Sequence, residues 1–475
     1  MSARQFILNY SSYNFLFQEL GKAVINEFRH SAQFTVGCVF AILLLFSGPA
    51  LVNIVLPTAD VSSAYAQKKK KGKEETPSIA DQTETRRVPA MRERTYKKLS
   101  EAQELLENKQ YQEALRLLNN LKGKGDLNEY EVAMTWNIVA YVYISQEKYK
   151  QAITAYREIL KLVNIPETLE QQILISAAQL HLATEQPREA IKLIQRLHKV
   201  AKPTTDSYAF YGQACFQIED YKCSITQMDN AVNLAFAQDG KPKEMWLLIM
   251  RYGYYELNNI PKMIEVLELL VKLYPKGDYF FQLAIAYGEA KDDAKQLSVL
   301  EASYDGGYFT KSQEYVTLAQ LLLSVDVPYK AAKILVEGFD KEIVDQTESY
   351  LKLLSQCWLL AQEPEKAVIV LKRAAKKSED GETFVRLGRS YQSMDDWTGC
   401  ITSIRAGLKK GDVKRPDSAR LNLGMCLFNA DRLNDAIKAF DQARKDKRSR
   451  KIADNWIEYL RNEKKRRQKI EEFLQ

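Results

Sequence analysis

The stretch Trp136-Asn-Ile-Val-Ala140-Tyr-Val-Tyr143, followed by Ala152 and Tyr156, decides how this chain folds. Its large residues and its first small residue recur at the three- and four-residue spacing of one helix face. The second small residue, Ala152, falls twelve positions after Ala140. Small residues on two consecutive helices let the helices approach closely, while the large residues pack against the next pair. The stretch therefore predicts a hairpin of two helices that can be repeated along the chain.

The same pattern returns along most of the sequence, for example at Phe384, Gly388 and Tyr391. It gives ten candidate hairpins, and their first small-residue positions are Ala102, Ala140, Ala178, Gly212, Arg251, Ala284, Ala319, Ser355, Gly388 and Gly424. Arg251 is not small, and the hairpin at Ala284 carries Gln296 where the second small residue is expected. An irregular helical bundle is the alternative. It is disfavoured because four of the hairpins match at several positions in one register.

These motifs resemble the tetratricopeptide repeat family, whose period is about 34 residues. The resemblance implies an all-α superhelix of about ten helical hairpins over residues 94–445. A stack of repeats needs a cover at its end. Residues 446–475 are expected to supply it as a basic capping helix, with Trp456, Ile457 and Leu460 on its apolar side.

The N-terminal segment 1–66 reads as a signal peptide or a signal anchor. Residues 31–59 carry no charge, and Ala64-Tyr65-Ala66 offers the small residues that signal peptidase accepts. Cleavage after Ala66 and retention as an inner-membrane anchor both stay open, and the second would give contact with the membrane through this segment. Either outcome predicts a periplasmic protein. Residues 67–93 are expected to form a disordered basic linker.

Composition narrows the function classes. The net charge is +7, but lysines 68–73 and the basic segment 444–469 account for more than this excess, so a nucleic-acid-binding face on the repeats is not expected. His30, His181 and His198 are the three histidines of the chain. Neither a phosphate loop nor a nucleophile motif is apparent. We therefore expect no catalytic site, cofactor or metal, and a protein that is not an enzyme.

The cysteines allow two interpretations, disulfide formation or packing as small side chains. After cleavage the chain would hold five thiols, of which Cys215 and Cys223 flank one turn and Cys400 and Cys426 lie on consecutive helices. Both pairs could form disulfides in an oxidising compartment. Alternatively, the cysteines fill positions that require a small side chain.

The first helix of each hairpin is expected to line a peptide-binding groove. Side-chain amides can pair with the backbone of an extended peptide, and aromatic rings can cover its side chains. The candidate groove residues are Gln103, Tyr141, Gln179, Gln213, Phe216, Tyr252, Tyr255, Phe281, Gln320, Gln356 and Phe428. The alternative is that this surface is exposed to solvent and binds no ligand.

A second resemblance concerns the arrangement around the repeats. The export segment and basic linker lead to Glu84-Thr-Arg-Arg-Val-Pro-Ala-Met-Arg-Glu93, and Lys414-Arg-Pro-Asp417 and Leu423-Gly-Met-Cys-Leu-Phe428 come late in the chain. This looks like the periplasmic tetratricopeptide proteins that accompany TonB–ExbB–ExbD systems in Gram-negative bacteria. It implies a non-enzymatic scaffold that binds protein partners among the TonB, ExbB and ExbD components and aids iron–siderophore uptake. A scaffold for pilus, outer-membrane or peptidoglycan machinery, and a hydrolase or transferase built on repeats, are the other classes considered.

Overall fold

The computed structural model describes residues 90–123 and 125–474. The expected signal segment, 1–66, and most of the expected linker, 67–93, lie outside the described residues. All regular elements within the described ranges are helices, and none of these helices combines the length and apolar character needed to cross a membrane. The described residues form two compact units, one ending at Val266 and one beginning at Leu267.

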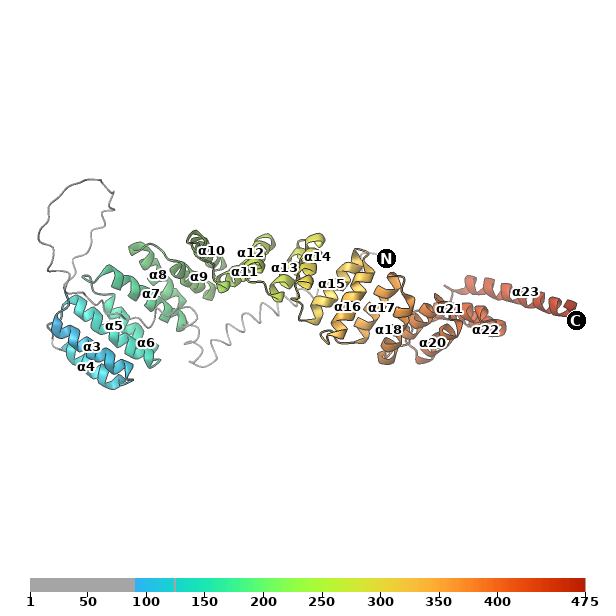
Figure 1. Cartoon of the computed structure of the whole chain (residues 1–475), viewed down its shortest axis with the longest axis horizontal. Coiled ribbons are helices and arrows are strands. Elements are labelled where there is room, and N and C mark those ends of the chain that lie inside the picture. The colour runs from blue at the N-terminus through green and yellow to red at the C-terminus, as the bar shows by residue number, and fades with distance from the viewer. Residues whose placement is uncertain (1–89, 124, 475) are drawn as a thin grey trace, which may run out of the picture. The chain divides into compact units, whose positions relative to one another are not determined.

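The first unit is a series of helical hairpins (Figure 1). Its helices are α3 (Glu93–Glu107), α4 (Tyr111–Gly123), α5 (Glu129–Ser145), α6 (Tyr149–Ile159), α7 (Glu167–Ala183), α8 (Pro187–Val200), α9 (Thr205–Gln217), α10 (Tyr221–Ala237) and α11 (Glu244–Glu256). Helix α12 (Ile260–Leu273) contains the boundary between the units. Four hairpins, α3–α4 to α9–α10, thus pair consecutive helices within this unit.

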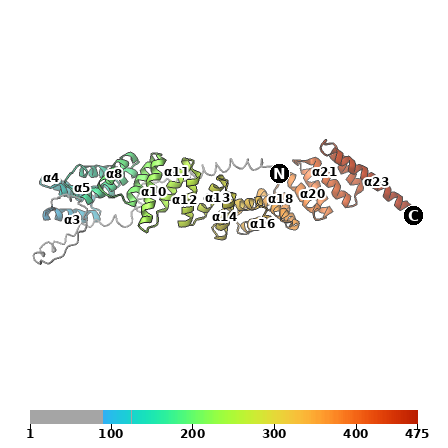
Figure 2. The same cartoon turned by 90° about the horizontal axis from the view of Figure 1, so that it is seen from above.

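The second unit continues the same plan (Figures 1 and 2). Its helices are α13 (Gly277–Glu289), α14 (Asp293–Asp305), α15 (Ser312–Ser324), α16 (Pro328–Asp340), α17 (Glu348–Leu360), α18 (Pro364–Lys377), α19 (Glu382–Gln392), α20 (Trp397–Lys410), α21 (Pro416–Asn429), α22 (Leu433–Ala443) and α23 (Arg450–Leu474). Five hairpins and a last single helix result, which confirms the predicted all-α repeat fold with a C-terminal capping helix.

Small residues set how closely the two helices of a hairpin approach. A Cβ on Gly388 of α19 would lie 2.4 Å from Ile404 of α20. A Cβ on Gly424 of α21 would lie 2.6 Å from the Phe440 ring of α22. Real side-chain contacts are not that short, so the two helices would have to separate if either glycine gained a side chain.

The turns inside the hairpins use a residue with positive φ that is not glycine. Glu147, Glu185, Glu219 and Asp326 have φ between 56° and 61° in four of these turns. A left-handed residue at the end of a helix lets the last carbonyl groups find donors in the turn, as when the amide of Gln186 donates to the carbonyl of His181. This turn chemistry explains how many tight turns coexist with only 20 glycines in the chain.

Two hairpins depart from the pattern, and the structure shows how each is accommodated. Arg251 is 5% exposed although a small residue was expected there. Two residues later, Gly253 makes a close approach to Ile225 of α10, the second helix of the preceding hairpin. In α14, Gln296 replaces the second small residue. Its amide lies 2.7 Å from where a Cβ on Gly288 would be, so the glycine makes room for the longer side chain.

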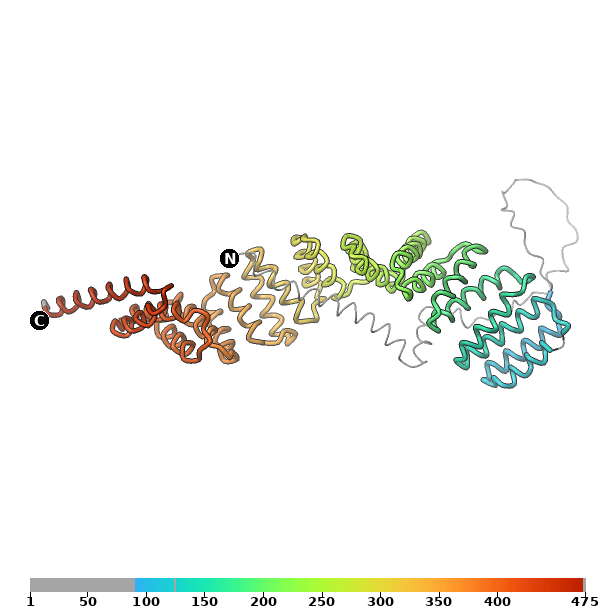
Figure 3. The backbone as a smooth tube through the Cα atoms, turned by 180° about the vertical axis from the view of Figure 1, so that it is seen from behind, coloured from blue at the N-terminus to red at the C-terminus, as the bar shows by residue number. Residues whose placement is uncertain are grey.

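The capping helix α23 packs on α22 through the predicted apolar side. Ile457 is 3% exposed and Leu460 is fully buried. The Trp456 ring stacks on Phe440 with centroids 5.5 Å apart and planes 5° from parallel. The C-terminal part of the helix runs on past α22 (Figure 3). Contacts with α22 reach as far along α23 as Lys464, which donates to Asn434.

Candidate functional site

The predicted groove residues differ in how much surface they offer. Gln320 and Gln356 are exposed, Tyr252 is buried, and the remaining eight are half-buried: Gln103, Tyr141, Gln179, Gln213, Phe216, Tyr255, Phe281 and Phe428. Seven belong to the first unit and four to the second, so each unit is described by itself. Each of the five glutamines directly follows the first small-residue position of its hairpin, yet they do not share one environment.

In the first unit, four rings from three helices form an aromatic cluster. We define it as Phe216 of α9, Tyr221 of α10, and Tyr252 and Tyr255 of α11. The Tyr252 ring lies at the centre, with centroid distances of 5.4 Å to Phe216, 6.0 Å to Tyr221 and 6.3 Å to Tyr255. Such edge-to-face contacts hold the rings in fixed positions.

The members of the aromatic cluster have different roles. Tyr252 is 4% exposed and offers almost no surface to a ligand, so its role is to support the other three rings. Burial, with a hydrogen bond to Glu256, raises the pKa of Tyr252, so its hydroxyl stays protonated. Phe216, Tyr221 and Tyr255 are half-buried and so offer more surface than Tyr252 does.

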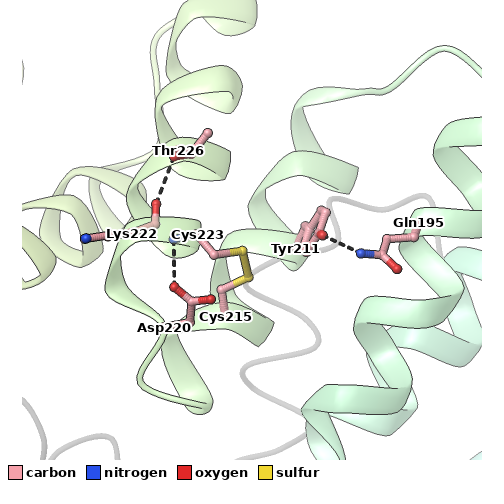
Figure 4. Close-up of a disulfide and its surroundings, with 7 residues drawn as sticks. All are labelled: Gln195, Tyr211, Cys215, Asp220, Lys222, Cys223 and Thr226. Atoms are coloured by element: carbon pink, nitrogen blue, oxygen red, sulfur yellow. Dashed lines mark hydrogen bonds between the residues drawn. A yellow bond between two sulfur atoms is a disulfide. The ribbon is translucent and has the colours of Figure 1, made fainter.

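A disulfide fixes the turn beneath this cluster. Cys215 of α9 is bonded to Cys223 of α10, and their Cα atoms lie 5.8 Å apart (Figure 4). Asp220 caps α10 by accepting a hydrogen bond of 3.0 Å from the Cys223 amide. Phe216 and Tyr221 stand on either side of this bonded turn, so the covalent bond fixes the spacing of their two helices. The second disulfide, Cys400–Cys426, joins α20 to α21 with Cα atoms 6.2 Å apart.

Sequence reasoning missed Tyr221, because only the first helix of each hairpin was searched for ligand contacts. The signal was present as an aromatic residue directly after the helix-capping Asp220. A capped helix start holds its first side chain beside the end of the preceding helix. Phe216 and Tyr221 accordingly approach to a centroid distance of 6.1 Å.

In the second unit, exposed apolar side chains gather at two hairpin turns. We call them the turn patch: Val325, Val327, Tyr329, Leu359 and Leu360, each between 36% and 51% exposed. The Tyr329 ring meets Trp358 edge-on at 5.6 Å, which joins the two turns. Lys366 Nζ lies 4.7 Å from the Trp358 ring centroid. Gln356, a groove candidate that is exposed, lies on α17 together with Trp358, one turn before Leu360.

The described residues contain no group of three His, Cys, Asp or Glu side chains that could hold a metal ion. His181 Nδ1 is 3.0 Å from the side-chain oxygen of Gln186, and His198 Nε2 is 2.9 Å from the Ser207 hydroxyl. Burial lowers the pKa of both histidines. His30 lies outside the described residues.

The basic side of α23 is partly occupied by ion pairs within the unit. Glu463 accepts hydrogen bonds from Arg466 and Arg467, both at 2.8 Å or less. Lys464 donates to the side-chain oxygen of Asn434 at 3.0 Å. Arg461 and Lys465 are exposed and form no such pair within the described residues.

A comparison with protein families finds a match for part of the chain. Residues 385–450 match the family model of the tetratricopeptide repeat, which confirms the predicted resemblance for this stretch of the second unit. The comparison with curated proteins finds no match.

Solved structures of similar fold share little sequence with this chain. A yeast Sti1 TPR2AB domain in complex with an HSP90 peptide is 15% identical, with a TM-score of 0.32, over 55% of this chain and 98% of its own. A tetratricopeptide repeat protein from Parabacteroides merdae is 15% identical, with a TM-score of 0.33, over 56% and 99%. Naa15/Naa10 bound to HypK-THB is 14% identical, with a TM-score of 0.40, over 77% and 67%.

Proposed function

We propose that this chain is a non-enzymatic periplasmic scaffold that binds proteins as an accessory of a TonB-type energy-transducing system. The aromatic cluster carries the binding part of this proposal. It combines a buried supporting ring, three half-buried ring faces and a disulfide-bonded turn on a repeat fold. Rigid aromatic surfaces contribute strongly to protein recognition because little side-chain entropy is lost on binding.

The two disulfides support the periplasmic part. Disulfides persist in oxidising compartments such as the bacterial periplasm and are rare where thiols are kept reduced. N-terminal sequencing of the protein recovered from cells tests export directly. A mature chain beginning at Gln67 is expected, a chain retaining Met1 would indicate an anchor, and recovery from the cytoplasm would contradict the proposal.

The TonB part rests on the sequence resemblance, and crosslinking tests it. A photo-reactive residue at Tyr255 should capture a partner in living cells, whereas the same residue at the exposed position Lys109, on a different hairpin, serves as a control. Capture of a TonB, ExbB or ExbD component at position 255 alone supports the proposal. Capture of a pilus, outer-membrane or peptidoglycan assembly component would replace it with an envelope-assembly scaffold.

Growth of a deletion strain provides a second test. An accessory of iron–siderophore uptake should be needed when iron is scarce and dispensable when iron is abundant. We therefore expect slower growth of the deletion strain only under iron limitation, with recovery on expression of the intact chain. Equal growth of mutant and parent under limitation would contradict the uptake role.

A further inference from the structure

The last helix of the second unit lacks the cover that every earlier first helix of that unit has. In those helices, the residue directly before the small-residue position is a buried leucine. These leucines are Leu283, Leu318, Leu354, Leu387 and Leu423, and each is at most 8% exposed. Tyr459 of α23 occupies the corresponding place, one repeat length after Leu423, and is 51% exposed. The Phe428 ring of α21 meets the Tyr459 ring edge-on, with centroids 5.8 Å apart, and leaves about half of the side chain exposed.

The exposed side of α23 extends from Tyr459 to Ile470. It comprises Tyr459, Glu463, Arg466 and Ile470, which we call the open seam, and the Glu463 side chain, at 12% exposed, is its most covered member. Successive members are separated alternately by four and three residues, the spacing by which one helix packs along another. Tyr459 and Ile470 are 51% and 44% exposed, so apolar surface remains open at both ends of the seam.

We propose that the open seam binds the same seam of a second copy of this chain, with the two α23 helices antiparallel. The second copy's helix then takes the place of a hairpin's second helix, which also runs antiparallel to the first. A two-fold interface uses the same patch on both copies, so the patch must complement itself.

The open seam meets this requirement. With the two-fold axis between positions 464 and 465, Glu463 of one copy faces Arg466 of the second copy, and Tyr459 faces Ile470. Each charged contact and each apolar contact then occurs twice. The Arg466 side chain is 66% exposed and already donates to Glu463 of its own helix at 2.7 Å. Two such pairs brought together form an alternating network of four charges.

The remaining cations of α23 do not oppose this pairing. Arg461 and Lys465 project from the opposite side of the helix, about 180° around from the seam at 100° per residue. Pairing through the seam therefore leaves these charges in water and does not bring them against their copies. Antiparallel pairing is thus favoured by charge complementarity as well as by the exposed apolar side chains.

Charge reversal tests the register of the pair. Sedimentation velocity of the full chain in a mild detergent should show a dimer at micromolar concentration. Glu463→Arg alone places four arginines at the axis, and Arg466→Glu alone places four glutamates there. Each single variant should weaken dimerisation by about tenfold or more, because like charges would meet across the interface.

Mixing the two single variants gives the decisive result. The Glu463→Arg chain and the Arg466→Glu chain should form a heterodimer, because opposite charges meet again at both contacts. Lys465→Glu serves as a control that leaves the dimer intact, and circular dichroism checks that every variant keeps its helices. A monomeric parent chain, or single variants that still form dimers, or a mixture that forms no heterodimer, would overturn the proposal. If the seam instead binds a helix of a different protein, the chain would sediment as a monomer and crosslink to that protein, which would also overturn the proposal.

Discussion

Ser449, in the turn before α23, donates a hydrogen bond of 2.7 Å to the buried carboxylate of Asp417 at the start of α21. Arg415 donates to the same carboxylate at 2.7 and 2.9 Å. The hydrogen bond from Arg415 lowers the pKa of Asp417, burial opposes this effect, and Ser449 adds to the lowering. Asp417 therefore joins the entry of one helix to the turn that positions the capping helix.

Replacing this carboxylate should loosen the C-terminal end of the stack. Asp417→Asn keeps the shape of the side chain but removes the negative charge that Arg415 and Ser449 bind. We expect a loss of about 1–3 kcal/mol in the free energy of unfolding, measured in urea. Ser449→Ala should cost about 1 kcal/mol because only one hydrogen bond is lost. Equal stability of Asp417→Asn and the parent chain would show that the carboxylate is dispensable.

Acid should destabilise the first hairpins through Glu131. Burial disfavours the charged form of this carboxylate, but hydrogen bonds from Arg92 and Asn128 outweigh burial and lower its pKa from 4.5 to about 2. The folded protein thus binds the proton more weakly than the unfolded chain does. The stabilisation is present above pH 4.5 and is lost as the pH falls towards about 2.

A thermal melt series across this pH range measures the effect. The parent chain should lose melting temperature steeply, and Glu131→Gln should show a shallower dependence from a lower starting value. Glu93→Gln is a suitable control, because Glu93 is exposed and pairs only with Lys97 of its own helix. Parallel curves for the parent and Glu131→Gln would show that Glu131 does not carry the acid response.

The repeat fold could be predicted from sequence because its determinants are local. Gly388 and Gly424 each meet a residue of the next helix, so a short motif records the contact that forms the hairpin. The pattern also located the hairpin at Ala284 despite Gln296. It could not show that Gly288 makes room for this glutamine, because Gly288 belongs to no fixed position of the motif.

The candidate site was less accessible to sequence reasoning because exposure depends on neighbouring hairpins. Tyr252 matched a groove position, yet Phe216 and Tyr221 of the preceding hairpin pack around it and leave it buried. Tyr255 also matched a groove position, and it is half-buried. Both residues are tyrosines at positions expected to line the groove. Only the packing of adjacent helices makes one a buried supporting ring and the other a more exposed ring.

A side chain at either close-approach glycine should separate two helices. Gly388→Ala places a Cβ 2.4 Å from Ile404, and Gly424→Ala places one 2.6 Å from the Phe440 ring. We expect each to cost about 1–3 kcal/mol, seen as a lower urea midpoint. Gly123→Ala is the matched control, since a Cβ there meets nothing within 4 Å. Destabilisation by Gly123→Ala equal to that of the other two would point to a general backbone effect.

The two disulfides should differ in what they contribute to stability. Cys400–Cys426 closes a longer loop than Cys215–Cys223, with sequence separations of 26 and 8. A longer loop loses more entropy from the unfolded chain, so removing the Cys400–Cys426 bond should cost about 3 kcal/mol and removing the other somewhat less. Paired Cys→Ser variants, melted under non-reducing conditions, measure the difference.

Thiol labelling of the native protein completes this comparison. Cys357 is the free cysteine of the described residues and is fully buried. Burial raises the pKa of its thiol to about 12, so almost no thiolate forms at neutral pH. A thiol reagent should therefore leave Cys357 unmodified until the protein is unfolded, and peptide mapping should find Cys215, Cys223, Cys400 and Cys426 blocked in both states. Labelling of these four cysteines on unfolding without a reductant would show that the disulfides do not form, and the support they give to an oxidising compartment would be lost with them.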